Sequence, residues 1–281
     1  MSDAPISTLI TPDGTRVAVR RWQAGARPRG LVLIVHGLGE HSGRYANVAA
    51  ALRGWGWDAA GFDQRGHGLS DGRRGGLRTA DDPFADLALV VDHLRPTGGP
   101  LVLLGHSMGG AIAARFVAEH RRRVDGLVLT SPALDAGLNA FQRLQLVVGH
   151  ALAPDLALGN GLDSNFIAHD AAVVRAYRAD ALVHDRVTAR LARVIVASGA
   201  AAVAAAPRWT VPTLLLYSGA DRLVAARGSD AFAAAAPPSV VEAERFDALY
   251  HEILNEGDAA APVYARLGAW LAQRFPAIAT A

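Results

Sequence analysis

The sequence contains no cysteine and no lysine. The lack of cysteine excludes disulfide bonds, thiolate metal sites and a cysteine nucleophile, and it leaves the redox compartment open. All 28 basic residues are arginines, and 26 acidic residues nearly balance them to a formal charge of +2. This balance argues against a nucleic acid as the main partner.

The first residues, Met1 to Pro5, lack the cationic start and apolar stretch of a secretory signal. The apolar run from Leu31 to Val35 is far shorter than the ~20 residues needed to cross a bilayer. We therefore expect a soluble, cytoplasmic protein.

Short apolar runs alternate with helical patterns along most of the chain, which is typical of parallel strands joined by helices. With 281 residues and 51% hydrophobic content, the chain can bury one large core. We predict an α/β fold with a mostly parallel sheet flanked by helices. The predicted strands are 31–35, 58–62, 101–104, 126–130, 213–217 and about 240–244, and the predicted helices are 45–54, 83–94, 111–120, 229–235 and 261–274.

The strand pattern stops between about Asp135 and Arg208, where alanine-rich helical segments follow one another without a convincing strand. We predict that residues 135–208 form an inserted helical cap on a core made of residues 1–134 and 209–281. One apolar group in this segment has near-helical spacing, and most of it is expected to pack against the sheet domain: Leu138, Phe141, Leu144, Val147 and Val148.

A glycine-flanked serine stands between a predicted strand and a predicted helix, in the motif Gly105-His-Ser107-Met-Gly109. A tight turn at this place needs glycine on both sides, because a Cβ there would collide with the strand and the helix. Such a turn lifts the hydroxyl above the carboxyl edge of the sheet and points the helix N-terminus at it. The motif therefore predicts Ser107 as a catalytic nucleophile.

A serine hydroxyl needs a histidine base and an orienting carboxylate. Asp221 follows the predicted strand 213–217, and His251 lies in a loop before the last helix, so we predict Asp221 as the acid and His251 as the base. Asp247 is the alternative acid, since it is nearer to His251 in sequence. The second requirement is a pair of backbone N–H donors for the oxyanion, which we assign to Met108 and Leu38.

The loop that holds Leu38 allows a different interpretation. Gly37, Gly39 and Gly43 follow a strand and precede a helix, and Asp63 ends the next strand, as in a dinucleotide-binding turn. This short glycine pattern is weak evidence, and His36 would crowd a pyrophosphate.

Several longer motifs resemble the monoacylglycerol lipase branch of the α/β hydrolases. They are the segments 36–45 (His-Gly-Leu-Gly-Glu-His-Ser-Gly-Arg-Tyr), 62–72 (Phe-Asp-Gln-Arg-Gly-His-Gly-Leu-Ser-Asp-Gly) and 249–256 (Leu-Tyr-His-Glu-Ile-Leu-Asn-Glu), together with the serine motif, the Asp221 segment and the cap segments 170–177 and 180–183. The chain departs from the animal members at Leu254, where they carry a second histidine, and at Ala181, where the cap motif usually has proline.

The resemblance implies an α/β-hydrolase fold and hydrolysis of monoacylglycerols, with the cap forming an apolar tunnel for the acyl chain. It implies that Glu40 and Tyr177 bind the glycerol end, that no metal or organic cofactor takes part, and that the partner is a lipid ester. It is also compatible with a transient contact between the cap and a membrane surface, and it leaves the oligomeric state open.

Three enzymes with the same catalytic residues are alternatives: a general carboxylesterase, a lysophospholipase and an aminopeptidase that releases N-terminal proline. The aminopeptidase would need acidic residues for a free amino group. An alternative of another class is a non-catalytic α/β-hydrolase homologue that binds apolar ligands, against which the presence of Ser107, Asp221 and His251 argues.

Overall fold

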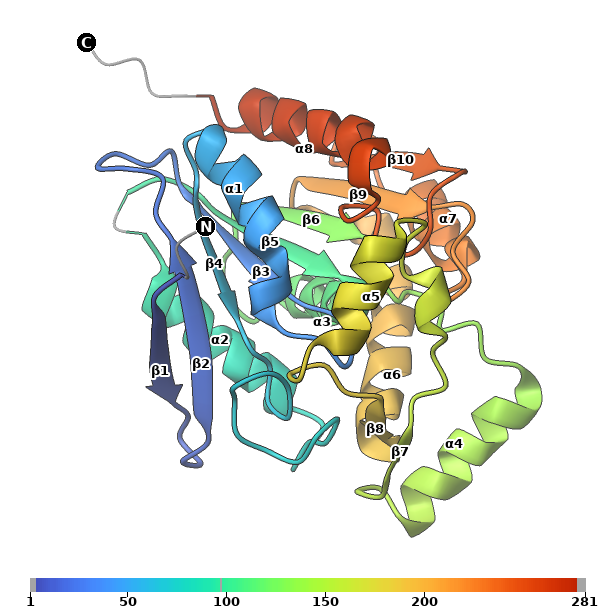
Figure 1. The fold of residues 1–281 in the computed structure, drawn as a ribbon. Coiled ribbons are helices and arrows are strands. Elements are labelled where there is room, and N and C mark those ends of the chain that lie inside the picture. The colour runs from blue at the N-terminus through green and yellow to red at the C-terminus, as the bar shows by residue number, and fades with distance from the viewer. Residues whose placement is uncertain (1–3, 97, 277–281) are drawn as a thin grey trace.

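The computed structural model describes residues 4–96 and 98–276. An eight-stranded sheet forms its centre, with the strand order β1-β2-β4-β3-β5-β6-β9-β10 (Figure 1). All pairs from β4 to β10 are parallel, whereas β2 runs antiparallel to both β1 and β4. The strands are β1 (Ile6–Ile10), β2 (Arg16–Trp22), β3 (Leu31–Val35), β4 (Asp58–Phe62), β5 (Leu101–His106), β6 (Gly126–Thr130), β9 (Thr213–Ser218) and β10 (Val241–Phe246).

Helices cover both faces of this sheet. The α-helices are α1 (Ala46–Gly54), α2 (Asp82–Leu94), α3 (Ser107–Ala118), α4 (Ala140–Leu152), α5 (Ala171–Ala179), α6 (Ala189–Ala205), α7 (Ala226–Ala235) and α8 (Ala261–Arg274). Short 3₁₀ turns are η1 (Ser42–Tyr45), η2 (Ser164–Phe166), η3 (Ala206–Arg208) and η4 (Gly257–Ala260). This architecture confirms the predicted fold class.

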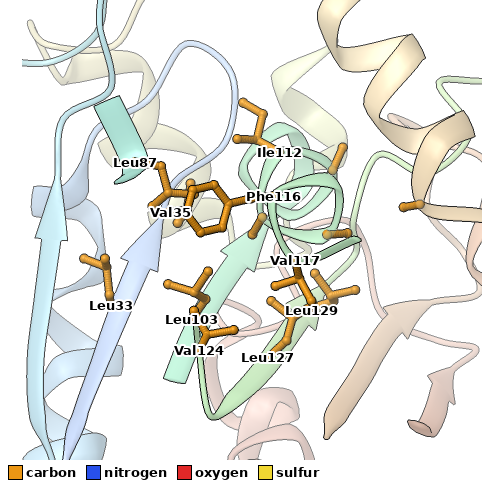
Figure 2. Packing of buried hydrophobic residues seen from close by; sticks show 14 of the residues in the cluster. Leu33, Val35, Leu87, Leu103, Ile112, Phe116, Val117, Val124, Leu127 and Leu129 are labelled. Atoms are coloured by element: carbon orange, nitrogen blue, oxygen red, sulfur yellow. The ribbon is translucent and has the colours of Figure 1, made fainter. Parts of the chain in front are cut away.

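The central strands are buried on both faces, which explains why their sequences are continuous apolar runs rather than alternating patterns. In β3, Val32 and Ile34 pack with α1 and α8, whereas Leu33 and Val35 pack with α2 and α3. Figure 2 shows the packing between the sheet and α2 and α3, with Phe116 of α3 lying over β3 and β5. The sheet is therefore the middle layer of three.

The N-terminal hairpin of β1 and β2 was not among the predicted strands. Its signal is the turn around Pro12, Asp13 and Gly14, where Gly14 has a φ of +83°. Val17 and Val19 of β2 are fully buried. The prediction missed the hairpin because its β1 half is mostly exposed and lacks an apolar run.

The proposed cap, residues 135–208, contains α4, α5 and α6, as its composition predicts. The expectation that it has no strand is wrong, because β7 (Ala157–Gly159) and β8 (Arg186–Thr188) form an antiparallel pair. Each strand has three residues, which is too short for a period of two to be visible in the sequence.

Helix α4 stands apart from the sheet domain at the edge of the cap (Figure 1). It contains no buried residue, and the exposed fractions of Phe141, Leu144, Val147 and Val148 are 66, 59, 58 and 46%. The prediction that this apolar group packs mostly against the sheet domain is therefore wrong. Helical spacing identified the helix and its apolar residues but not the surface that they meet.

Helix α6 with η3, residues 189–208, is the one described segment that is long and apolar enough to cross a bilayer by length and composition. In the structure it lies on the sheet domain against α3, and its buried residues include Leu191, Val194 and Ala202. Gly199 allows the close approach, because a Cβ there would lie 2.5 Å from the carbonyl oxygen of Ala133. These contacts are those of a core helix.

Candidate active site

Ser107 occupies a strained turn between β5 and α3. Its φ is +52°, in the left-handed region that residues other than glycine rarely adopt. A Cβ on Gly109 would lie 2.1 Å from the carbonyl oxygen of Val35, and one on Gly105 would lie 2.7 Å from the Cα of Gly110. The glycines are therefore required for the turn, and α3 begins at Ser107 itself, four residues before the predicted start.

The loop after β3 lies directly beside this turn. A Cβ on Gly37 would lie 3.3 Å from the Cβ of Ser107, and Gly37, Leu38 and Ser107 line the same cavity. Met108 is the second residue of α3, so its N–H belongs to the first turn, where helical N–H groups have no partner within the helix. Both assigned oxyanion donors thus belong to segments that border the nucleophile.

His251 forms a hydrogen bond with Asp221, with 2.6 Å between Nδ1 and Oδ2. The other oxygen of Asp221 accepts hydrogen bonds from the backbone N–H groups of Leu223 and Val224, at 2.8 and 3.0 Å. Because an ionised carboxylate only accepts, Nδ1 of His251 carries the proton and Nε2 keeps its lone pair. Asp247, the alternative acid, is instead exposed and paired with Arg245.

Burial and charge act in opposite directions on this pair. Burial raises the pKa of Asp221, but the charge and hydrogen bond of His251 and the two backbone N–H groups lower it further, so the pKa lies below its usual value. Burial lowers the pKa of His251, but the charge and hydrogen bond of Asp221, with the charges of Glu252 and Glu40, raise the pKa above its usual 6.5. The arrangement therefore stabilises an imidazolium that forms when His251 takes a proton.

A second imidazole, that of His106, lies next to the first, with 4.8 Å between the ring centroids. Burial, followed by the neighbouring His251, lowers the pKa of His106 to about 4. Its Nδ1 lies 3.0 Å from the carbonyl oxygen of Thr130. The ring of His106 is therefore uncharged near neutral pH.

Ser107 and His251 open into one cavity of about 250 Å³ between the sheet domain and the proposed cap. Apolar lining comes mainly from five side chains, Leu38, Leu162, Ile167, Val183 and Leu223. The polar lining includes Glu40 and Tyr177, which we predicted to bind glycerol. The structure thus brings the predicted nucleophile, base and substrate residues to a single cavity, with Asp221 directly behind the base.

Glu40 is more deeply engaged with the protein than the sequence indicated. It is almost completely buried, and its Oε1 accepts hydrogen bonds from the Gly37 N–H and the Tyr45 hydroxyl, at 2.6 and 2.7 Å. Its Oε2 lies 2.6 Å from Nη1 of Arg44. Sequence reasoning missed Arg44 and Glu252, which form a bidentate ion pair beside the base. The sequence held no plain signal for this group, because Glu40 and Arg44 precede the predicted helix 45–54 and Glu252 is 208 positions from Arg44.

The dinucleotide interpretation lacks support in the geometry. Asp63 is fully buried, and its oxygens accept hydrogen bonds from the backbone N–H groups of Ser42 and Leu69, at 2.9 and 2.8 Å. His36 is also fully buried beneath this loop, where its Nε2 accepts a hydrogen bond from the Gln64 N–H. The carboxylate braces the loop and is not free to bind a ribose.

Within residues 4–96 and 98–276, histidine and carboxylate side chains form no group of three or more that could hold a metal ion.

Comparisons with known proteins agree with this description. Residues 26–258 match the family described as "Serine aminopeptidase, S33". The monoacylglycerol lipase of Mycolicibacterium smegmatis is 34% identical over 251 residues, which are 86% of this chain and 88% of that protein. An uncharacterized abhydrolase domain-containing protein of Dictyostelium discoideum is 30% identical over 89% of this chain, but the match spans only 27% of its length.

Among solved structures, that of the monoacylglycerol lipase of Paleococcus ferrophilus superposes with a TM-score of 0.83. It is 31% identical, and the match covers 91% of this chain and 99% of that one.

Proposed function

This chain belongs to the S33 family of α/β hydrolases and is a carboxylic ester hydrolase, and from that premise we propose that it cleaves monoacylglycerols to glycerol and fatty acid through an acyl-enzyme on Ser107. The single observation that carries the proposal is the cavity into which a strained serine and an aspartate-bound imidazole both open. The lipases named among the relatives support the choice of substrate.

In the first half of the reaction, Oγ of Ser107 attacks the ester carbonyl carbon while Nε2 of His251 takes the hydroxyl proton. The N–H groups of Leu38 and Met108 bind the oxyanion, whose charge they stabilise more strongly than that of the starting carbonyl. The bond to the glycerol oxygen then breaks, and His251 returns the proton to the leaving alcohol.

In the second half, a water molecule attacks the acyl-enzyme. His251 takes a proton from the water and gives it back to Oγ of Ser107, which releases the fatty acid. Asp221 stabilises the imidazolium in both halves without becoming protonated.

The lining of the cavity offers two kinds of contact for the two ends of the substrate. Apolar side chains such as Leu38 and Ile167 offer contacts for the acyl chain, whereas Tyr177 and Glu40 offer polar groups for the glycerol. Tyr177 is the better candidate for glycerol, because the carboxylate of Glu40 already accepts three hydrogen bonds. We place the glycerol beside the Tyr177 hydroxyl.

The exposed apolar face of α4, defined by Phe141, Leu144, Val147 and Val148, favours contact with a lipid surface. Leu152, at the end of the same helix, is 81% exposed and extends this face. An exposed group of this kind at the cap fits an enzyme whose substrate lies in a bilayer or micelle.

The direct test is the Ser107→Ala variant, assayed on monoacylglycerols of rising chain length and on short soluble esters. We expect turnover to fall by ~10⁴-fold or more, because the nucleophile, base and acid act as one unit. Ser131→Ala is a matched control, because Ser131 also has a positive φ of +41° but no predicted role. Near wild-type hydrolysis by the Ser107→Ala protein would end the proposal.

The aminopeptidase alternative requires a carboxylate free to bind an amino group. Four carboxylates line the cavity, and each already has a partner: Glu40 and Glu252 bind Arg44, Asp180 binds His41, and Asp185 pairs with Arg186. Prolyl amides should therefore be poor substrates in the same assay series. Labelling of Ser107 by a fluorophosphonate separates all of these enzymes from a non-catalytic binding protein, which should not react.

A further inference from the structure

A buried ion network joins the two loops that flank the nucleophile. Nη1 and Nη2 of Arg44 lie 2.7 and 2.8 Å from the two carboxylate oxygens of Glu252, and Nη1 also lies 2.6 Å from Oε2 of Glu40. The exposed fractions of the three side chains are 10% or less. We call this group of Glu40, Arg44 and Glu252 the Arg44 bridge.

One end of the Arg44 bridge holds the oxyanion loop. Oε1 of Glu40 accepts the N–H of Gly37 at 2.6 Å, and Gly37 is the residue whose Cβ would lie 3.3 Å from that of Ser107. Leu38, the assigned oxyanion donor, follows directly. A shift of Glu40 would therefore move the backbone from which the oxyanion is bound.

The other end holds the loop of the base. Glu252 directly follows His251, and its N–H donates to the carbonyl oxygen of Ile167 in the cap at 2.7 Å. Its Oε2 also accepts a hydrogen bond from Asn255, at 2.9 Å. With its backbone and its carboxylate both bound, Glu252 fixes where the chain carrying His251 runs.

Arg44 itself does not line the cavity, although Glu40 and Glu252 do. The ring of Tyr177 lies over its guanidinium, with 4.7 Å between Cζ and the ring centroid. A guanidinium held in this way presents its donors to the two carboxylates, which match its planar fork. Arg44 therefore acts on the site through the residues that it contacts, which do line the cavity.

The Arg44 bridge also has an electrostatic effect on the imidazole of His251. Two carboxylates and one guanidinium leave one net negative charge (−2 + 1 = −1) in a buried position beside His251. The charged and titratable groups that face this imidazole are Asp221, Glu252, Glu40 and His106, with Arg44 behind the two glutamates. The glutamates thus add to the support that Asp221 gives the imidazolium.

We propose that Arg44 and Glu252 are positioning residues, which fix the distance between the oxyanion loop and the base through Glu40 and add negative charge beside His251. This role rests on the proposed function, since it presupposes that Ser107 and His251 perform the reaction. It makes the geometry of catalysis depend on a side chain that does not contact the substrate.

The first test compares Arg44→Met, Arg44→Lys and wild type on a soluble short-chain ester, with active sites counted by fluorophosphonate titration. We expect kcat per titrated site to fall ~10²-fold in Arg44→Met with KM within about threefold, because small displacements of reacting groups have costs of this size. Lysine keeps the positive charge but lacks the planar pair of N–H donors, so the kcat of Arg44→Lys should fall about tenfold.

The control is Arg53→Met, because Arg53 is an exposed arginine of α1 that donates only to the carbonyl oxygen of Gln23 among its described bonds. If Arg44→Met folds poorly, its titrated fraction falls, and Arg44→Lys carries the test. Full kcat per titrated site in both Arg44 variants would overturn the proposal while leaving the proposed function intact. Hydrolysis by Ser107→Ala would instead overturn the function itself.

The second test is the pH profile of kcat/KM for Glu252→Gln. The pKa of His251 is raised in the wild type, and the base works only when neutral, so activity rises through a pH above 6.5. Removing the negative charge at position 252 destabilises the imidazolium, so the rise should move about 0.5 to 1 unit toward lower pH.

Glu244→Gln is the control for this profile, because Glu244 of β10 pairs with Arg266 of α8 and does not line the cavity. A merely structural role for Glu252 would lower the amount of active enzyme without moving the midpoint. An unmoved midpoint in Glu252→Gln would therefore exclude the proposed electrostatic effect of Glu252 on His251.

Discussion

One helix of the sheet domain, α3, and one helix of the proposed cap, α4, place their apolar residues in opposite surroundings. In α3, which begins at Ser107, nine residues are buried, whereas α4 in the proposed cap buries none. Both helices have strongly apolar sequences of similar length, 12 and 13 residues. The difference shows that apolar content alone does not define a core, since α6 of the proposed cap is packed against α3 whereas α4 of the same segment is exposed.

The two regions are nevertheless joined where the reaction takes place. The carbonyl oxygens of Phe166 and Ile167 in the cap accept the N–H groups of His251 and Glu252, and Asp180 of the cap binds His41 of the sheet domain at 2.8 Å. The loop that carries His251 is thus held by the proposed cap on one side and by Arg44 on the other. The proposed cap therefore contributes to the position of the base as well as to the wall of the cavity.

The largest single effects are expected from replacements in the sheet domain. Asp221→Asn should lower kcat by ~10⁴-fold, because an amide at this place favours the wrong tautomer of the base. Asp247→Asn is the matched control, since this exposed aspartate pairs only with Arg245 among the described residues and its replacement should leave kcat unchanged. Equal losses in the two variants, measured with a short soluble ester, would contradict the assignment of the acid.

Glycine replacements should separate the two regions by their effect on stability. A Cβ on Gly109 would lie 2.1 Å from the carbonyl oxygen of Val35, so Gly109→Ala should destabilise the protein by about 3 kcal/mol. In α4, a Cβ on Gly149 would meet only Ala189, at 3.8 Å, so Gly149→Ala should stabilise by roughly 0.5 to 1 kcal/mol. Urea unfolding of both variants tests this, and opposite signs are required.

The same contrast explains what could be predicted from the sequence. The bounds predicted for β4, β6 and α8 match the structure, because buried strands and a helix that begins beside a proline leave plain signals in the chain. The prediction also selected Asp221 over Asp247, and His251 does contact Asp221. Each of these features depends on local pattern and on strand order.

Features that depend on contacts between distant segments were not predictable in this way. The Arg44 bridge joins residues 208 positions apart, and nothing in the spacing of Glu252 indicates its partner. The pair β7 and β8 is too short to produce a visible period, and the exposure of α4 depends on where the cap sits. Sequence patterns identify such elements but not their surroundings.

The smallest effect in this comparison is expected for α4, where it should depend on the physical form of the substrate. We consider a variant with both Phe141→Gln and Leu144→Gln, and Gln145→Ala as a control on the same exposed helix. Because neither apolar side chain is buried, the double variant should change the free energy of unfolding by less than about 0.5 kcal/mol.

On a soluble short-chain ester the double variant should match the wild type. On monoacylglycerol in vesicles its rate should fall about tenfold, because a loss of roughly 1.4 kcal/mol in surface binding corresponds to that factor and is within the range for two apolar side chains. If the double variant matched the wild type on both substrate forms, α4 would have no role in binding the lipid surface. A marked loss of stability would instead show that its apolar face packs within the protein, and the contrast between the two regions would then fail.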